Sequence, residues 1–196
     1  MRKGWGTVVA CAALCVTLSA TPAEAAFPGQ NGKIAFTGTI DGQGGIHAIN
    51  PDGTDPTRLV GFGWAPAWSP SGTRIAFDCG AMLCVANADG SNQDIWYDEG
   101  STLNSIDWAP DETKLALIDL PIDWEQTHLS WRVAQLEPPP PAGGVIDVDV
   151  QPSGAASWSP DGSRIAFVDG WQLPVGGIQT VAPDGAGSRQ FQIQRT

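Results

Sequence analysis

Positive charge is scarce in this chain of 196 residues. Lys and Arg number 10 against 21 Asp and Glu, which gives a formal net charge of -11. Binding of nucleic acid phosphates requires clustered Lys and Arg, so the composition excludes nucleic acid as a partner. It leaves open a cationic partner or a metal ion. Charged residues of both signs make up only 16% and hydrophobic residues 42%, which predicts one globular domain rather than a disordered chain.

Histidines and catalytic motifs are also scarce. The only two histidines, His47 and His128, have no nucleophile or metal-ligand partner at a telling spacing. Neither a G-x-S-x-G nucleophile elbow nor an H-E-x-x-H zinc motif occurs. The N-x-D-G segments lack the string of oxygen ligands that a calcium loop needs. The sequence therefore predicts no catalytic residues, no metal site and no cofactor, and it favours a binding protein over an enzyme.

Long apolar runs are absent except at the N-terminus. Arg2 and Lys3 precede an apolar stretch at 4–20, and Ala23-Glu24-Ala25 forms a small-x-small cleavage site. We predict a signal peptide at 1–25 and an exported mature chain at 26–196, secreted or periplasmic, with no membrane span. The alternatives are an uncleaved anchor, which needs about 20 apolar residues, and lipidation of Cys11.

Only four cysteines occur, and two of them, Cys11 and Cys15, lie in the predicted signal peptide. The others, Cys79 and Cys84, flank a predicted four-residue turn at 80–83 between two apolar runs. A hairpin with this turn would place them directly opposite each other, with Cβ atoms about 4.5–5.5 Å apart. Outside the cytosol such a pair oxidises, so we predict a structural disulfide. The alternative, a metal site, would need two further ligands nearby.

Glycine and proline, by contrast, are abundant, with 24 and 16 residues, and they mark a repeat. Three copies align without gaps and a fourth keeps only its second half. The copies comprise residues 68–77, 108–117 and 158–167, with the shorter one at 31–36. The equivalent residues Ile34, Ile75, Leu115 and Ile165 are 41, 40 and 50 positions apart. An Asp-Gly unit follows several copies.

Each part of the repeat has a structural explanation. Ser-Pro-Asp-Gly is turn chemistry, since Pro presets φ, Asp bonds its own backbone and Gly accepts φ > 0. The Ile-Ala-Phe run that follows is typical of a short strand buried on both faces. The preceding Trp is large enough to fill the space between sheets.

A period near 40 residues with four strands predicts an all-β fold, a β-propeller with about four four-stranded blades, the first lacking its inner strand. The predicted blades span about 31–60, 64–97, 104–150 and 155–193. In the third copy Glu112 replaces the turn glycine, which would cost about 1 kcal/mol if that position needs φ > 0. Ring closure stays open: a closed four-blade ring, an open half-ring, or a homodimer that completes one ring.

The W-S-P-D-G-x-x-I-A-F core and the trailing N-x-D-G resemble the TolB-type, WD-like β-propeller repeat over essentially the whole predicted mature chain. This resemblance implies an extracytoplasmic propeller that acts as a protein-binding module in envelope complexes, although related propellers sit beside peptidase domains. TolB proteins have six blades and an additional N-terminal domain, whereas this sequence shows four copies and no such domain. Fold alone does not fix function.

Regular and irregular connections should lie on opposite rims of the propeller. The repeated turns share one rim, and the other rim carries irregular loops, which include 37–45 and 61–66. Irregular loops on a regular scaffold are the usual location of binding.

We therefore predict a binding surface at the irregular rim that comprises Trp64, Asp98, Glu99, Trp124, Glu125, Asp169 and Trp171. Aromatic rings and carboxylates together suit a sugar, a peptide or a cationic group. Alternatively, the tryptophans pack against loop bases and the acids are solvated.

Two functions follow from these patterns. The first is an exported binding or scaffold module that recognises a protein or glycan partner. The second is a propeller hydrolase or lyase with an acidic or metal-dependent site in the central channel. Such an enzyme needs carboxylates from several blades near the axis, and Asp107 is the only acid in the predicted first strands. The binding module is therefore favoured. The composition is typical of a GC-rich bacterial genome.

Overall fold

The computed structural model describes residues 32–98, 102–120, 130–135, 145–148, 152–169 and 177–191. The predicted signal peptide lies outside these residues. Within them every regular element is a strand, and no helix of a length and apolarity that could cross a membrane occurs. The strands are β1 (Ile34–Ile40), β2 (Gln43–Ile49), β3 (Thr57–Val60), β4 (Trp64–Trp68), β5 (Arg74–Asp78), β6 (Met82–Asn87), β7 (Asp94–Asp98), β8 (Thr102–Trp108), β9 (Lys114–Leu120), β10 (Ser130–Gln135), β11 (Val145–Val148), β12 (Pro152–Trp158), β13 (Ile165–Asp169), β14 (Gly177–Val181) and β15 (Arg189–Phe191).

These strands form four antiparallel sheets, each made of strands consecutive in sequence. The first sheet has three strands in the order β1-β2-β3, and the others are β4 to β7, β8 to β11 and β12 to β15. The repeat fixes the register, because Trp68 pairs with Ile75 and Trp158 with Ile165 at equivalent places. Among the described residues, the first sheet has no counterpart of β4, β8 and β12, which begin the other three sheets.

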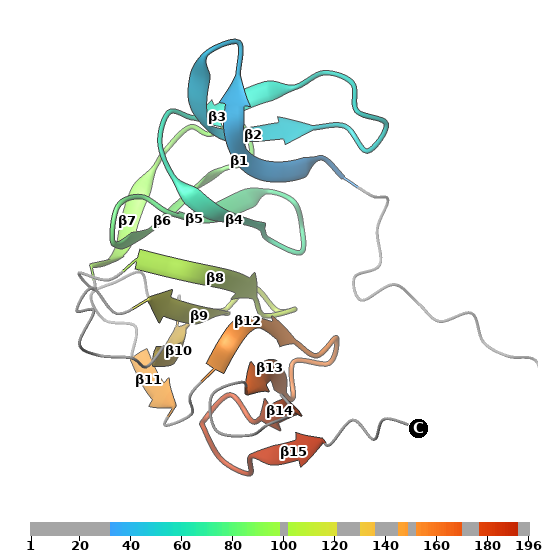
Figure 1. Ribbon diagram of the computed structural model, residues 1–196, viewed down its shortest axis with the longest axis vertical. Coiled ribbons are helices and arrows are strands. Elements are labelled where there is room, and N and C mark those ends of the chain that lie inside the picture. The colour runs from blue at the N-terminus through green and yellow to red at the C-terminus, as the bar shows by residue number, and fades with distance from the viewer. Residues whose placement is uncertain are drawn as a thin grey trace, which may run out of the picture.

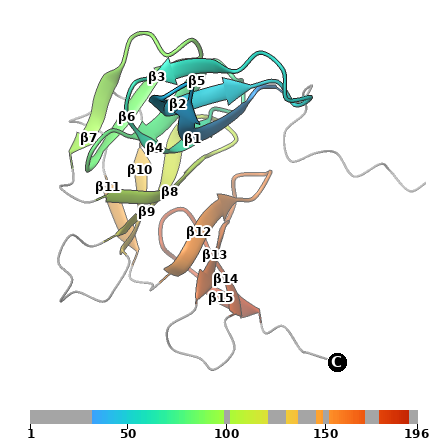
Figure 2. The same ribbon diagram turned by 45° about the horizontal axis from the view of Figure 1, so that its top comes forward.

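The four sheets follow one another along an arc. Strand β8 contacts both β4 and β12, while β1 lies against β4. Figures 1 and 2 show the first sheet at one end of the arc and the fourth at the other. The first strands of neighbouring sheets therefore meet on the inside of the arc.

The core consists of three apolar layers, one at each junction between sheets. The first layer includes Ile46, Ile75 and Phe77, and all three are fully buried. At the second junction Trp108 is buried, and its Nε1 donates a hydrogen bond of 3.0 Å to the Ala67 carbonyl of the preceding sheet. Burying one large apolar side chain contributes about 1.5–3 kcal/mol, so these layers hold the arc together.

The predicted turn chemistry is present in the repeats. Gly72 and Gly162 both have φ of 68°, and Glu112 adopts φ of 58° at the equivalent place. The N–H of Glu112 donates to the Ala109 carbonyl at 2.9 Å, as that of Gly72 does to Ser69 at 2.8 Å. The position therefore needs φ > 0, and Glu112 carries the expected conformational cost.

Two predicted loops were too long. Residues 37–45 belong mostly to β1 and β2, which are joined by a two-residue turn at Asp41 and Gly42, with φ of 50° and 78°. Asp-Gly with both residues at φ > 0 is the favoured two-residue hairpin turn, and it outweighs the many glycines on either side. In the second case β4 already begins at Trp64, so the predicted loop at 61–66 is shorter.

Candidate functional site

Three of the seven predicted binding residues lie within the described part of the chain. Trp64 is the first residue of β4, Asp98 the last of β7 and Asp169 the last of β13. Trp64 of β4 pairs with Asp78, and Asp98 of β7 pairs with Met82. Both therefore lie at the end of the second sheet that carries the β5–β6 turn, on its two opposite edge strands. The remaining four, Glu99, Trp124, Glu125 and Trp171, lie outside the described residues.

An exposed aromatic pair occupies the β4 side of this end of the sheet. The side chains of Phe62 and Trp64 are 53% and 45% exposed, and their rings meet edge to face with centroids 4.5 Å apart. Sequence reasoning missed Phe62, although its position between Gly61 and Gly63 was a signal. Edge-to-face contact is a favourable aromatic arrangement, so the two rings support each other while presenting open faces.

The backbone beneath the pair is tightly packed. A Cβ added at Gly63, where φ is 149°, would lie 2.9 Å from the Asp78 carbonyl oxygen and equally close to Ile46 and Phe77 side-chain atoms. Ala65 has φ of 47°, a conformation that costs of order 1–3 kcal/mol and persists only when its surroundings enforce it. This segment therefore holds the aromatic pair in a defined position.

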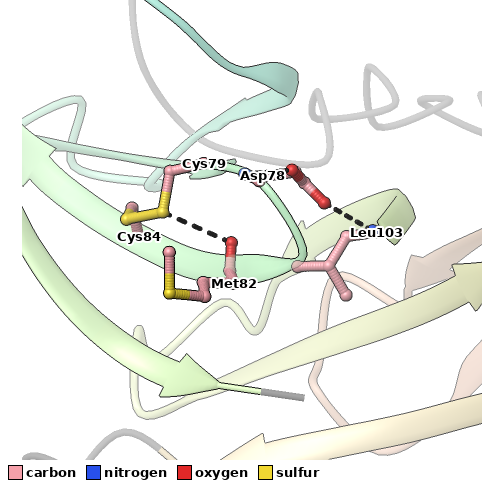
Figure 3. The surroundings of a disulfide bond; sticks show 6 residues. Asp78, Cys79, Met82, Cys84 and Leu103 are labelled. Carbon is pink, nitrogen blue, oxygen red and sulfur yellow. Dashed lines mark hydrogen bonds between the residues drawn. A yellow bond between two sulfur atoms is a disulfide. The ribbon is translucent and has the colours of Figure 1, made fainter. Parts of the chain in front are cut away.

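A disulfide closes the neighbouring hairpin, as predicted. Cys79 and Cys84 are bonded with Cα atoms 5.8 Å apart (Figure 3). The expected placement directly opposite each other was wrong, because β6 begins at Met82 and Cys84 pairs with Phe77. The turn consists of Gly80 and Ala81, both at positive φ, so the cysteines are diagonal neighbours. The sequence could not show that this turn holds two residues rather than four.

Asp78 fixes the same hairpin to the third sheet. Its carboxylate is fully buried. One carboxylate oxygen accepts a hydrogen bond of 2.7 Å from the Gly80 N–H. The other oxygen accepts a hydrogen bond of 2.6 Å from the Leu103 N–H of β8 (Figure 3). The hairpin is thus braced by a covalent bond within it and by a buried carboxylate beneath it.

A second feature lies at the rim of the repeated turns, between the first and second sheets. A cavity of about 820 Å³ opens there. It is lined by Gly32, Lys33, Thr57, Leu59, Trp68, Ser69, Pro70, Ser71, Gly72, Ala88 and Asp89. The Trp68 Nε1 is buried without a hydrogen-bond partner. Sequence reasoning missed this cavity, because the repeated turns look alike from one blade to the next.

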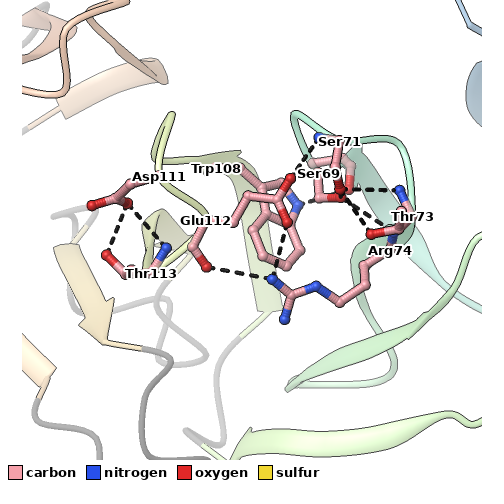
Figure 4. A network of polar contacts seen from close by, with 9 residues as sticks. Ser69, Ser71, Thr73, Arg74, Trp108, Asp111, Glu112 and Thr113 are labelled. Carbon is pink, nitrogen blue, oxygen red and sulfur yellow. Dashed lines mark hydrogen bonds and ion pairs between the residues drawn. The ribbon is translucent and has the colours of Figure 1, made fainter.

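The corresponding space at the second junction is filled by polar contacts. The Glu112 carboxylate faces Arg74 at 3.2 Å and accepts a hydrogen bond from the Ser71 N–H (Figure 4). The Arg74 guanidinium lies 4.8 Å from the centroid of the Trp108 ring. Burial raises the pKa of Glu112, but hydrogen bonds from Ser71 and Arg74 together outweigh it and hold the pKa below its usual value.

Two described carboxylates, those of Asp107 and Asp161, are engaged in hydrogen bonds to neighbouring groups. Asp107, on β8, accepts a hydrogen bond of 2.7 Å from the Trp158 N–H of the next sheet. Burial raises its pKa. Hydrogen bonds from Ser159 and Ser163 lower the pKa of Asp161 to about 2 within its turn. Among the described residues no group of three or more His, Cys, Asp or Glu side chains is placed to hold a metal ion.

Neither a protein-family profile nor a curated protein matches the sequence. Solved structures do match the fold. TolB from Acinetobacter baumannii is 14% identical, with a TM-score of 0.63 over 81% of this chain and 40% of that one. The nidogen/laminin complex gives 16% identity and a TM-score of 0.57 over 76% and 57% of the two chains. An oligogalacturonate lyase in complex with manganese gives 18% identity and a TM-score of 0.58 over 81% of this chain and 48% of that one.

All three matches are β-propeller proteins. The chain has a β-propeller fold. The predicted class is therefore confirmed, and the described part of the first blade has three strands. The chain spans about half the length of these structures, from 40% to 57%. At such identities the likeness extends to the fold alone, and the three alternatives for ring closure stay open.

Proposed function

We propose that the protein is an extracytoplasmic propeller module that binds a partner protein or glycan through its irregular rim. The observation that carries this proposal is the exposed Phe62 and Trp64 pair, held beside a disulfide-closed hairpin. Large apolar rings left open to solvent on a rigid scaffold are typical of recognition surfaces. The disulfide supports an oxidising, extracytoplasmic location.

The chemistry of the rim suits a sugar or an extended peptide. Aromatic faces stack on sugar rings, prolines and cationic side chains. Asp98 ends β7 at the same end of the sheet, on the edge strand opposite the pair, and the net charge of -11 favours a partner that carries positive charge. The similar nidogen structure was solved with laminin bound, which supports protein recognition by this fold.

The enzymatic alternative lacks a comparable observation. A lyase or hydrolase in the central channel would need free carboxylates on the inner strands. Asp107 is the acid that sequence reasoning placed there, and its carboxylate accepts the Trp158 N–H of the next sheet. The likeness to a lyase is a likeness of fold.

The proposal is tested with arrays of glycans and of peptides, probed with the oxidised chain, followed by titration of each positive compound. Phe62→Ala and Trp64→Ala should each weaken binding about tenfold or more, because central aromatic contacts carry most of the energy of such surfaces. The matched control is Ile95→Ala, which removes an apolar side chain that is 60% exposed on β7, away from the pair.

Equal binding by all three variants would contradict the proposal. Incubation of each positive compound with the protein, followed by mass spectrometry, separates binding from turnover. Cleavage of a glycan or peptide that survives Trp64→Ala would favour the enzymatic alternative instead.

A further inference from the structure

The first sheet has an open edge on β1. Ile34 is 53% exposed, whereas its repeat equivalents Ile75, Leu115 and Ile165 are fully buried. The difference has a direct cause. Ile75 and Ile165 each pair with a tryptophan on the first strand of their sheet, and β1 has no such neighbour in the described chain. An edge with an exposed Ile is a site for a further strand.

The cavity of about 820 Å³ lies where this missing strand would end. Gly32 and Lys33, at the start of β1, line one side, and Trp68 lines the other. At the next junction the equivalent of Trp68 is Trp108, whose Nε1 donates to the Ala67 carbonyl of the preceding first strand. The Trp68 Nε1 has no acceptor among the described residues. The Trp158 Nε1 is also without a partner among the described residues. An unpaired indole therefore indicates a missing strand only where an open sheet edge and a cavity accompany it, as they do at Trp68.

The sequence just before Gly32 has the spacing of the repeat. Phe27 precedes Ile34 by seven residues, as Trp68 precedes Ile75 and Trp158 precedes Ile165. Ala26 then corresponds to Ala67. Asn31 falls at the turn position that has φ of 68° at Gly72 and 58° at Glu112. After Gly, Asn is among the residues that best tolerate this conformation.

We propose that residues 26–31 dock on the first sheet and supply the end of its inner strand and the following turn. In this arrangement Phe27 lies opposite Ile34 and takes the place that tryptophan has in the other sheets. The Ala26 carbonyl then accepts the Trp68 Nε1–H, as the Ala67 carbonyl accepts that of Trp108. This inference is independent of the proposed binding function.

The register makes the proposal testable by disulfide cross-linking. Ala67 pairs with Ala76 in the second sheet, so Ala26 should pair with Ala35 of β1. The test protein is the full chain carrying Cys11→Ser and Cys15→Ser, with Cys79 and Cys84 retained. Ala26→Cys with Ala35→Cys should form an intrachain bond, because directly opposite Cβ atoms lie within reach of a disulfide.

The matched control is Ala26→Cys with Phe36→Cys, one residue out of register and therefore on the opposite face. Its yield should be about tenfold lower, since the two side chains point apart. Mass spectrometry of peptides from unreduced protein measures the yield of the cross-link in both variants. Equal yields, or no bond in either variant, would overturn the proposal, and a bond between two chains would show that a second copy fills the edge.

A second measurement avoids engineered cysteines. Hydrogen exchange of the Trp68 indole N–H, read by NMR, should be slow in the unmodified chain and in Phe27→Trp. Phe27→Ala should accelerate it severalfold, because the docked segment loses its largest apolar contact. Exchange that is equally fast in all three proteins would also overturn the proposal.

Discussion

Glu112 shows how one residue can combine a local cost with a long-range gain. Its φ of 58° costs about 1 kcal/mol relative to Gly. Its carboxylate, however, reaches Ser71 and Arg74 of the preceding sheet, which Gly72 and Gly162 cannot do from the same turn position. The partly buried ion pair and hydrogen bond contribute roughly as much as the backbone costs. The departure from the repeat is therefore compensated at the second junction.

This balance predicts the effects of two substitutions. Glu112→Gln keeps the backbone strain and loses the ion pair, so the free energy of unfolding should fall by about 0.5–1 kcal/mol at neutral pH. Glu112→Gly also relieves the strain and should leave stability nearly unchanged. Because the folded-state pKa of Glu112 is lowered, its stabilisation is present above the usual value of 4.5 and is lost as pH falls through the folded value.

Urea denaturation at several pH values measures these effects. The difference between the unmodified protein and Glu112→Gln should shrink as pH falls below 4.5. Asp94→Asn, which removes an exposed carboxylate on β7, is the control for net charge. A Glu112→Gln deficit that stays constant into the acid range would show that the ion pair with Arg74 contributes nothing.

At the scale of elements, the β5–β6 hairpin should depend on its disulfide. Cys79 and Cys84 are five residues apart, and closing so short a loop stabilises a fold by about 2 kcal/mol in the chain-entropy treatment. The double variant Cys79→Ser, Cys84→Ser should lose about this amount in urea denaturation. With reductant present, the unmodified protein should lose the same amount while the variant does not change. A reductant effect on the variant would mean that another bond is involved.

Strand positions were predictable wherever the repeat carried turn chemistry. The Ser-Pro-Ser-Gly turn at 69–72 set the start of β5 and the Ser-Pro-Asp-Gly turn at 159–162 that of β13. The equivalent turn that contains Glu112 set the start of β9. The errors arose where glycine content suggested a loop, at 37–45, and where a turn length was guessed, at 80–83. In both places the deciding factor was which residues take φ > 0, and spacing alone does not reveal it.

The candidate site was predictable only in part. Trp64 was identified from its place between blades, and the structure leaves its ring exposed. Phe62 and the cavity beside Trp68 were missed for different reasons. An aromatic residue between glycines can pack inward or outward, and its burial depends on the tertiary fold. The cavity arises because the first and second junctions differ. Lys33 and Gly72 line the cavity at the first junction, whereas the equivalent residues at the second, Arg74 and Glu112, form an ion pair.

Across the whole molecule, each sheet is tied to its neighbour by a polar contact near the first strand. The Thr37 hydroxyl donates to the Gly63 carbonyl at 3.4 Å, and Asp78 and Asp107 accept from the backbone of the next sheet. Such a molecule behaves as a row of units whose stability depends on their junctions. Loosening one junction should therefore free the sheet beyond it before the others.

Asp107 offers the sharpest test, because its charge and its acceptor role can be separated. Burial raises its folded-state pKa, so the ionised form is disfavoured in the folded protein. The contribution of Asp107 to the stability of the protein should then fall as pH rises above the usual value of 3.8 and through the folded value. Asp107→Asn keeps an acceptor for the Trp158 N–H without the charge. It should match or exceed the unmodified protein at neutral pH, by a margin that grows with pH over this window.

Asp107→Ala removes the acceptor and leaves the Trp158 N–H unpaired, which costs about 1–3 kcal/mol. Hydrogen exchange read by mass spectrometry should show faster exchange in β12 to β15, while β4 to β7 keep their protection. Asp107→Asn is the matched control, and in this variant both sheets should keep their protection from hydrogen exchange. If Asp107→Ala accelerated exchange equally in both sheets, the molecule would unfold as one cooperative unit, and the carboxylate would not be a local tie between the third and fourth sheets.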